Sequence, residues 1–133
     1  MSRLLLDTSA YAAFKRGHAP VTVALQQAEE IYLNPVVLGE LLAGLRRGSR
    51  RSKNGEELRA FLSSPRVHVV DVTEETTDRY AVILNALREL GTPIPTNDVW
   101  IAASAMEHGL RVLTTDAHYQ IVGQVVVDYL AQT

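Results

Sequence analysis

The sequence has no cysteine, a single tryptophan and no apolar run that approaches the length of a membrane span. The absence of cysteine excludes disulfides, thiolate zinc sites and cysteine nucleophiles, and it fits a reducing compartment. The leucine run near the amino end is far too short for a signal peptide. We therefore expect a soluble, cytoplasmic protein that does not contact a membrane.

An excess of charge of one sign is also lacking. The 13 Lys and Arg residues stand against 15 Asp and Glu, which gives a formal net charge of -2. Any contact with nucleic acid must therefore come from a local patch and not from the field of the whole molecule. With 133 residues, of which 47% are apolar, the chain has the size and mix of one domain, and we expect a single domain over residues 1–133.

What the chain does contain is an alternation of short apolar strands with helices. Strands are predicted at residues 3–6, 31–33, 67–72, 111–114 and 124–127. Helical spacing separates most of them, which implies right-handed crossovers between parallel strands. The predicted fold class is therefore α/β, with a mostly parallel central sheet of about five strands covered by helices on both faces in three layers.

Two segments between the predicted strands have features of their own: a helix near the end of the chain and a basic stretch in the middle. A late helix, which Thr96 or Asn97 can cap, is predicted to run to Gly109. Residues 46–53, the densest run of positive charge, are predicted to be a loop. This loop either contacts phosphates or is simply solvated, and its arginines are Arg46, Arg47, Arg50 and Arg51.

Four carboxylates stand near the edge where parallel sheets collect ligands. Asp7 directly follows the first strand and Asp116 lies two residues past the fourth, so both should project over the carboxyl ends of the strands. Asp98 lies in the first turn of the helix before the fourth strand, and Glu40 lies in the helix after the second strand. Each acid alone also fits an ordinary helix cap or a solvated side chain.

The four acids together point to a metal. They stand beside apolar runs, where unpaired charges would repel one another unless a cation neutralises them. Oxygen ligands favour Mg²⁺ or Mn²⁺, and either one ion or a pair is compatible with the sequence. The neighbouring hydroxyls of Thr8, Ser9 and Thr114 either bond the acids or cap strand ends, and Thr8 and Thr114 are the better candidates for bonding them.

The chain resembles the PIN-domain family in four stretches that span almost its whole length: LLLDTSAY, VVLGELLAG, NDVWIAASAMEHGL and VLTTD. In length and motif order it is similar to the VapC-type toxins of toxin-antitoxin pairs. The resemblance implies a Rossmann-like domain that cuts RNA with Mg²⁺ or Mn²⁺ and forms a homodimer. It also implies a cognate antitoxin that blocks the acidic site from a groove, with DNA reached only through that antitoxin.

The resemblance also assigns roles to particular residues. The four acidic positions of the family fall on Asp7, Glu40, Asp98 and Asp116, and Asn97 and Thr114 match its polar neighbours. The family usually has Phe where this chain has Tyr119, a difference that we expect to affect packing only. The four histidines lack a two-histidine metal spacing, so none of them is assigned a catalytic role.

Two other protein classes that place an aspartate after the first strand fit the sequence less well. A haloacid-dehalogenase phosphatase needs a second acid where this chain has Ser9, and a receiver domain needs a lysine after the fourth strand, which is absent. The serious alternative is a catalytically silent PIN-like module that binds RNA or protein. A catalyst should lose activity on Asp7→Asn, whereas the affinity of a pure binding module should survive that change.

Overall fold

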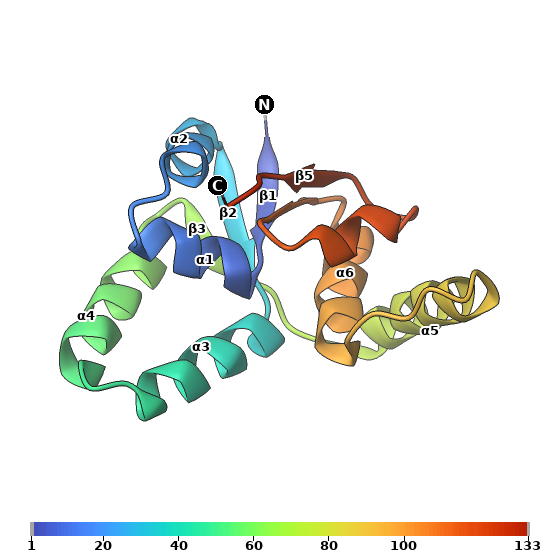
Figure 1. Cartoon of the computed structure of the whole chain (residues 1–133), viewed down its shortest axis with the longest axis horizontal. Coiled ribbons are helices and arrows are strands. Elements are labelled where there is room, and N and C mark those ends of the chain that lie inside the picture. Colours follow the sequence, from blue (N-terminus) through green and yellow to red (C-terminus); the bar gives the residue numbers. More distant parts are fainter. Residues whose placement is uncertain (1, 133) are drawn as a thin grey trace.

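The computed structural model describes residues 2–132 and is built around a fully parallel sheet with the strand order β3-β2-β1-β4-β5. The earliest strand in the chain therefore lies at the centre of the sheet (Figure 1). The strands are β1 (Arg3–Leu6), β2 (Glu30–Leu33), β3 (Val67–Val69), β4 (Arg111–Thr114) and β5 (Val127–Tyr129).

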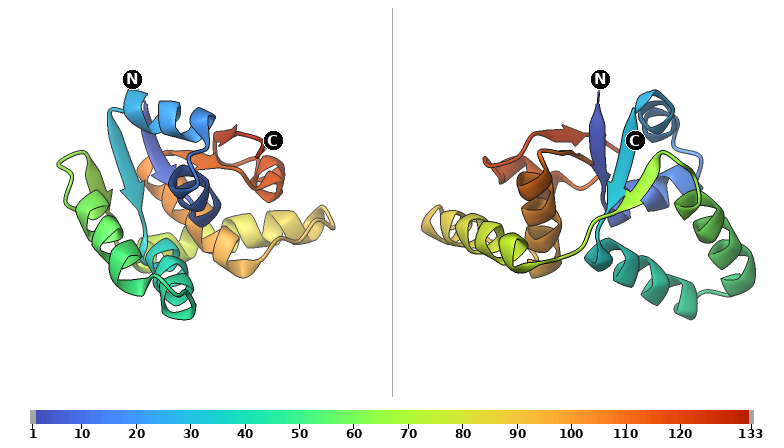
Figure 2. Two further views of the ribbon diagram at one scale, coloured as in Figure 1. Left: turned by 60° about the vertical axis from the view of Figure 1, so that its left-hand side comes forward. Right: turned by 180° about the vertical axis from the view of Figure 1, so that it is seen from behind.

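Helices cover the two faces of this sheet, as Figures 1 and 2 show. On one side lie α1 (Thr8–Lys15), α2 (Ala19–Gln27) and α4 (Arg51–Leu62). On the other side α6 (Thr96–His108) packs on the sheet and α5 (Glu74–Glu89) packs on α6. The remaining helix, α3 (Pro35–Arg47), lies past the carboxyl ends of the strands. The predicted three-layer α/β class is confirmed.

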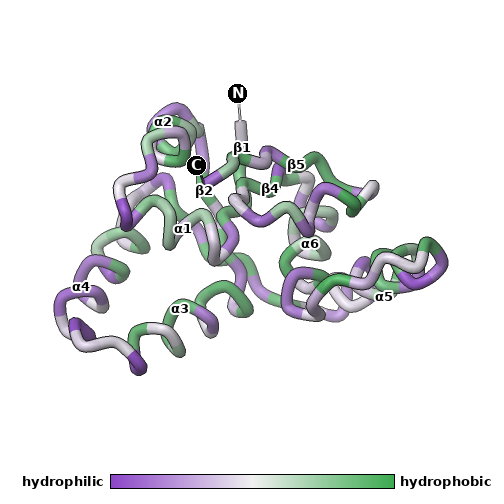
Figure 3. Tube along the Cα trace, viewed as in Figure 1, coloured by the Kyte–Doolittle hydropathy of each residue, from purple (hydrophilic) through white to green (hydrophobic). Residues whose placement is uncertain are grey.

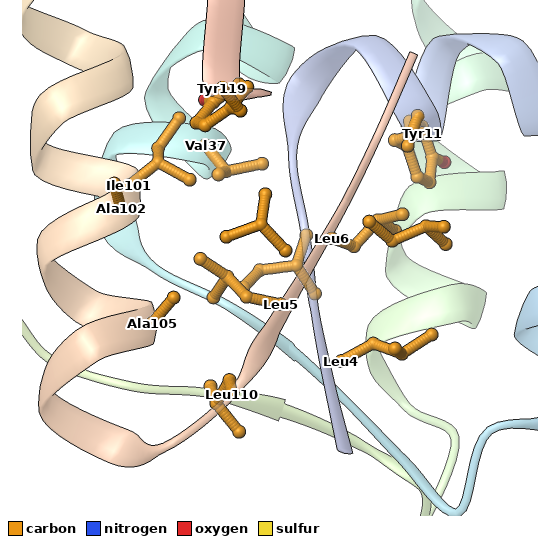
Figure 4. Packing of buried hydrophobic residues seen from close by; sticks show 14 of the residues in the cluster. Leu4, Leu5, Leu6, Tyr11, Val37, Ile101, Ala102, Ala105, Leu110 and Tyr119 are labelled. Carbon is orange, nitrogen blue, oxygen red and sulfur yellow. The ribbon is translucent and has the colours of Figure 1, made fainter. Parts of the chain in front are cut away.

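The core follows from the alternation of side chains along β1. Leu4, Leu5 and Leu6 are all buried, and Figure 4 shows Leu5 directed toward Ala105 of α6 while Leu6 lies on the side of Tyr11 of α1. A strand that is apolar on both faces needs helices on both sides, which explains why β1 is central. Hydrophobic residues gather along the strands and α6, whereas α4 is mostly hydrophilic (Figure 3). Within residues 2–132, no helix is long and apolar enough to cross a bilayer.

Polar caps end the two central strands and begin the next helices. Asp7 ends β1, and its carboxylate accepts a hydrogen bond from the Ala10 amide at 2.8 Å, which caps α1. Asn34 ends β2 and caps α3 by accepting from the Val37 amide at 3.0 Å. The Asn34 amide also donates to the Ser104 hydroxyl at 2.9 Å, so the start of α3 is tied to α6.

Two predicted strands had wrong bounds. The fifth strand is Val127–Tyr129 and not residues 124–127, because these are the residues that pair with β4, where Asp128 also forms a bidentate ion pair with Arg111 at 2.6 and 2.8 Å. The third strand stops at Val69, short of residue 72, since its partner β2 ends at Leu33 and the chain then turns into α3. Strand ends here are decided by neighbouring strands and not by local β propensity.

Two local predictions were also wrong. The basic stretch is mostly helical, since α3 runs to Arg47 and α4 starts at Arg51, in keeping with the high helix propensity of Arg and Lys. The late helix does end before Gly109, which has φ +65°, but its cap is Pro95, without a side-chain bond. Thr96 and Asn97 lie inside its first turn instead.

Candidate active site

The four predicted acids lie at the carboxyl edge of the sheet. From the central β1, the chain continues toward β2 and β3 on one side, while β4 and β5 lie on the other, so the topology switches between β1 and β4. Loops leave such a switch point in opposite directions and open a crevice there. Asp7 follows β1 and Asp116 follows β4, so both stand at this point.

Asp7 is the most enclosed of the acids, with only 3% of its surface exposed. Besides the Ala10 amide, it accepts hydrogen bonds from the Ser9 hydroxyl at 2.9 Å and the Thr114 hydroxyl at 2.7 Å. Burial raises the pKa of Asp7 to about 6, although these three donors oppose the shift; the charge of Asp98 adds to it. The protein therefore holds a costly buried charge at this position.

Asp98 and Asp116 come together from different elements. Because α6 leads into β4 and reverses direction, its first turn, with Asp98, lies at the carboxyl edge beside Asp116. Burial raises the pKa of Asp98, and the negative charges of Asp116 and then of Glu40 raise it further. The mutual repulsion is what a bound cation would relieve.

The short 3-10 helix η1 (Ala117–Ile121) adds two residues to this pair. Asp116 caps it by accepting from the His118 amide at 2.9 Å. The His118 Nδ1 atom lies 3.2 Å from Asp116 Oδ1 and 3.7 Å from Asp98 Oδ2. The buried Tyr119 donates its hydroxyl to Asp98 Oδ1 at 3.2 Å. One ligand atom each of Asp98, Asp116 and His118 lies within 4.8 Å of the others.

Glu40, the half-buried fourth acid, is held by residues from two other helices. It accepts a short hydrogen bond from the Thr8 hydroxyl of α1 and one from the Asn97 amide of α6 at 3.2 Å. The negative charge of Glu40 raises the pKa of Asp98. Thr8 and Asn97 thus orient the only acid contributed by α3.

Two hydroxyls, those of Thr114 and Ser9, connect the ends of β1 and β4 to the acids. The fully buried Thr114 donates to Asp7 and accepts from the Asp116 amide at 2.9 Å, so it joins two acids. The Ser9 hydroxyl accepts from the Thr115 amide at 3.1 Å while it bonds Asp7. This arrangement fixes the loops after β1 and β4 against each other.

The sequence-based selection was incomplete at three positions. Ser9, ranked below Thr8 and Thr114, also donates a hydrogen bond to one of the acids, at 2.9 Å to Asp7. Tyr119 does more than pack, because its hydroxyl bonds Asp98, so the expectation of a packing role alone was wrong. His118, left without a role, lies against two acids, and its position two residues after Asp116 was the available signal.

A groove of about 420 Å³ opens beside Glu40, between α1, α3 and α4. Its apolar lining includes Tyr11, Leu41 and Leu58, and its cations are Lys15, Arg16 and Arg47. Of the four predicted arginines, only Arg47 lines this groove. The exposed Arg46, Arg50 and Arg51 do not line it, because they lie around the turn between α3 and α4. Lys15 and Arg16, which the sequence did not single out, take their place.

The donor set fits a divalent cation. It consists of carboxylate oxygens at a partly exposed edge, where the charges of Asp116 and Glu40 are close enough to add to the effect of burial in raising the pKa of Asp98. Hard oxygen ligands are what Mg²⁺ and Mn²⁺ prefer. The acidic cluster therefore has both the chemistry and the unrelieved repulsion of an ion site.

Comparison with known proteins identifies the family. Residues 4–124 match the PIN domain model, and the chain belongs to the PIN-domain family. It is 32% identical to Ribonuclease VapC4 of Mycobacterium tuberculosis, over 69% of this chain and 71% of that protein. It is 34% identical to Ribonuclease VapC1 of Rickettsia felis, over 84% of this chain and 83% of that protein. The predicted resemblance is thus confirmed.

A solved structure supports the same fold. The crystal structure of VapBC2 from Rickettsia felis bound to a DNA fragment from their promoter superposes with a TM-score of 0.80 at 22% identity. The match covers 96% of this chain and 98% of that chain. At 22% identity, this similarity shows a common fold and nothing further.

Proposed function

We propose that this protein is a Mg²⁺- or Mn²⁺-dependent endoribonuclease and the toxin of a type II toxin-antitoxin pair. The observation that carries the proposal is the convergence of Asp98 and Asp116 within 4.8 Å at the switch point of the sheet, with Asp7 and Glu40 alongside. Membership of the PIN-domain family and identity to proteins named Ribonuclease VapC support the same activity.

Asp7, Glu40, Asp98 and Asp116 would hold the ion. A divalent ion bound there supplies a Lewis acid for hydrolysis of an RNA phosphodiester. The protein contributes orientation: Thr114 and Ser9 fix Asp7, and Thr8 and Asn97 fix Glu40. Carboxylate oxygens not engaged by these donors accept the proton of the attacking water. The products carry 5'-phosphate and 3'-hydroxyl ends.

The groove beside Glu40 serves the RNA and the antitoxin. Lys15, Arg16 and Arg47 supply positive charge for backbone phosphates next to the acids. Its apolar lining suits a protein segment, so an antitoxin seated there would cover the same entrance. The relation to VapBC complexes in fold supports such a partner.

A homodimer is part of the proposal. Leu42 on α3 and Leu90, the residue after α5, are 51% and 69% exposed, which is costly for large apolar side chains in water. Burial of these positions in a symmetric interface would remove that cost. Light scattering coupled to size exclusion should give twice the chain mass, and Leu42→Glu should shift it toward the monomer.

The activity is tested by cleavage of a structured-RNA pool with Mg²⁺ or Mn²⁺, with identification of the product ends. We expect cleavage to vanish with a chelator and in Asp98→Asn, but to persist in Asp71→Asn, a matched change at an exposed aspartate outside the set of four acids. Cleavage that survives both the chelator and Asp98→Asn would discard the proposed site. RNA binding without cleavage in the native protein would favour the silent binding module.

A further inference from the structure

His118 lies beside the acidic cluster, and the proposed function assigns it no role. Its ring comes from η1 and is 57% exposed, so it does not fill the core. The residue after it, Tyr119, is fully buried and bonds Asp98 Oδ1. Since Tyr119 anchors η1 and engages one oxygen of Asp98, the other oxygen, Oδ2, is left facing the His118 ring.

The distances around the ring match those between ligands of one ion. For metal-ligand bonds of about 2.1 Å in an octahedron, neighbouring ligand atoms are about 3.0 Å apart and opposite ones about 4.2 Å. His118 Nδ1 lies 3.2 Å from Asp116 Oδ1 and 3.7 Å from Asp98 Oδ2, between these two values. A single ion could therefore touch all three atoms with little movement.

We propose that His118 is a nitrogen ligand of the ion held by Asp98 and Asp116, and that it biases this site toward Mn²⁺ over Mg²⁺. The inference rests on the proposed function, because it adds a ligand to the same site. Imidazole binds first-row transition ions well, whereas Mg²⁺ prefers oxygen, so a mixed nitrogen and oxygen set favours manganese. Carboxylate ligands alone suit both ions.

A plain electrostatic role predicts a different result. If His118 only served as a cation that offsets the acids, it would repel any divalent ion equally. Where the imidazole is charged, its removal would then tighten the binding of both Mn²⁺ and Mg²⁺, and at a pH where it is neutral both affinities would stay unchanged. The ratio of the two affinities in a variant separates the two roles, because a ligand changes that ratio and a nearby positive charge does not.

The test measures metal binding by the full-length protein at pH 8, above the ordinary pKa of imidazole. Titration calorimetry gives the Mn²⁺ affinity, and competition gives that of Mg²⁺, for the native protein, His118→Ala and the control His68→Ala on β3. We expect His118→Ala to weaken Mn²⁺ binding about 10-fold and to change Mg²⁺ binding by less than about 3-fold. His68→Ala should match the native protein.

Pulsed electron paramagnetic resonance of the bound Mn²⁺ gives a direct signature. The native protein and His68→Ala should show coupling to an imidazole nitrogen, and His118→Ala should not. Equal changes in both affinities, or no nitrogen coupling in the native protein, would overturn the inference while leaving the acidic site intact. Failure of the proposed function is distinct, because Mn²⁺ binding would then be absent from the native protein or unchanged in Asp98→Asn.

Discussion

Asp7 and the Asp98–Asp116 pair share one edge of the sheet but are treated differently by the protein. Asp7 is almost fully buried and accepts bonds from a backbone amide and two hydroxyls, Ser9 and Thr114. Asp98 and Asp116 are more exposed, have fewer protein donors and repel each other. Hydrogen-bond donors of the protein hold Asp7 in place, whereas a bound cation would relieve the repulsion between Asp98 and Asp116.

The largest effect is expected from Asp7→Asn, which tests whether the buried position of Asp7 carries a charge that destabilises the fold. Folding raises the pKa of Asp7 from 3.8 to about 6, so its stabilising contribution is complete below pH 4 and is lost as pH rises through about 6. Asp7→Asn removes the buried charge, so without metal the variant should be more stable at pH 7.5 by about 1 to 3 kcal/mol. Cleavage should nevertheless be lost.

Denaturant unfolding of both proteins between pH 4 and pH 7.5, with a chelator present, measures this difference. The advantage of Asp7→Asn should be near zero at pH 4 and should grow with pH. An advantage that does not vary with pH would mean that the buried charge of Asp7 is not its source.

The next largest effect is the stabilisation of the fold by Mn²⁺ bound at Asp98 and Asp116. Manganese at about 100 times its dissociation constant should stabilise the native protein by about 2.7 kcal/mol, because only the folded chain presents the site. Asp98→Asn should abolish most of this gain, and Asp7→Asn should abolish less, since Asp98 belongs to the tight group with Asp116 and His118. Thermal unfolding with and without Mn²⁺ measures this gain in the native protein and its loss in each variant. An equal loss in the two variants would erase the proposed distinction between the two regions.

Thr114→Val tests the connection between the regions. Valine keeps the shape of the side chain but removes the hydroxyl that donates to Asp7 and accepts from the Asp116 amide. We expect about a 10- to 100-fold loss of cleavage, as for other groups that orient metal ligands. The matched control is Thr92→Val, because the buried Thr92 hydroxyl has no partner among the described residues. If the two variants cleave RNA equally well, the role of Thr114 is not supported.

The smallest effect is expected at Tyr119→Phe. Phenylalanine preserves the packing and loses only the hydrogen bond to Asp98 Oδ1, which is worth about 1 kcal/mol. Cleavage should fall by a few-fold, and the folded state should lose a similar amount of stability. Steady-state kinetics and denaturant unfolding measure these two quantities. Unchanged values for both would restore the packing role expected from the sequence.

The sequence predicted the parts of this arrangement that depend on strand ends. Asp7 and Asp116 could be placed because residues after parallel strands share one edge. The contacts of Ser9 and Tyr119 could not, since they depend on how two loops distant in the sequence meet in space. The bounds of β5 were missed for a similar reason, because they depend on its pairing with β4 and not on local propensity.

The central position of β1 has a consequence for synthesis. Asp7 and Glu40 leave the ribosome early, but their counterparts Asp98 and Asp116 lie in the last third of the chain, and β4 must join β1 before the acids can meet. A nascent chain that has not reached residue 116 carries only part of the acidic set. The cluster is therefore completed only after residue 116 has been synthesised and β4 has paired with β1.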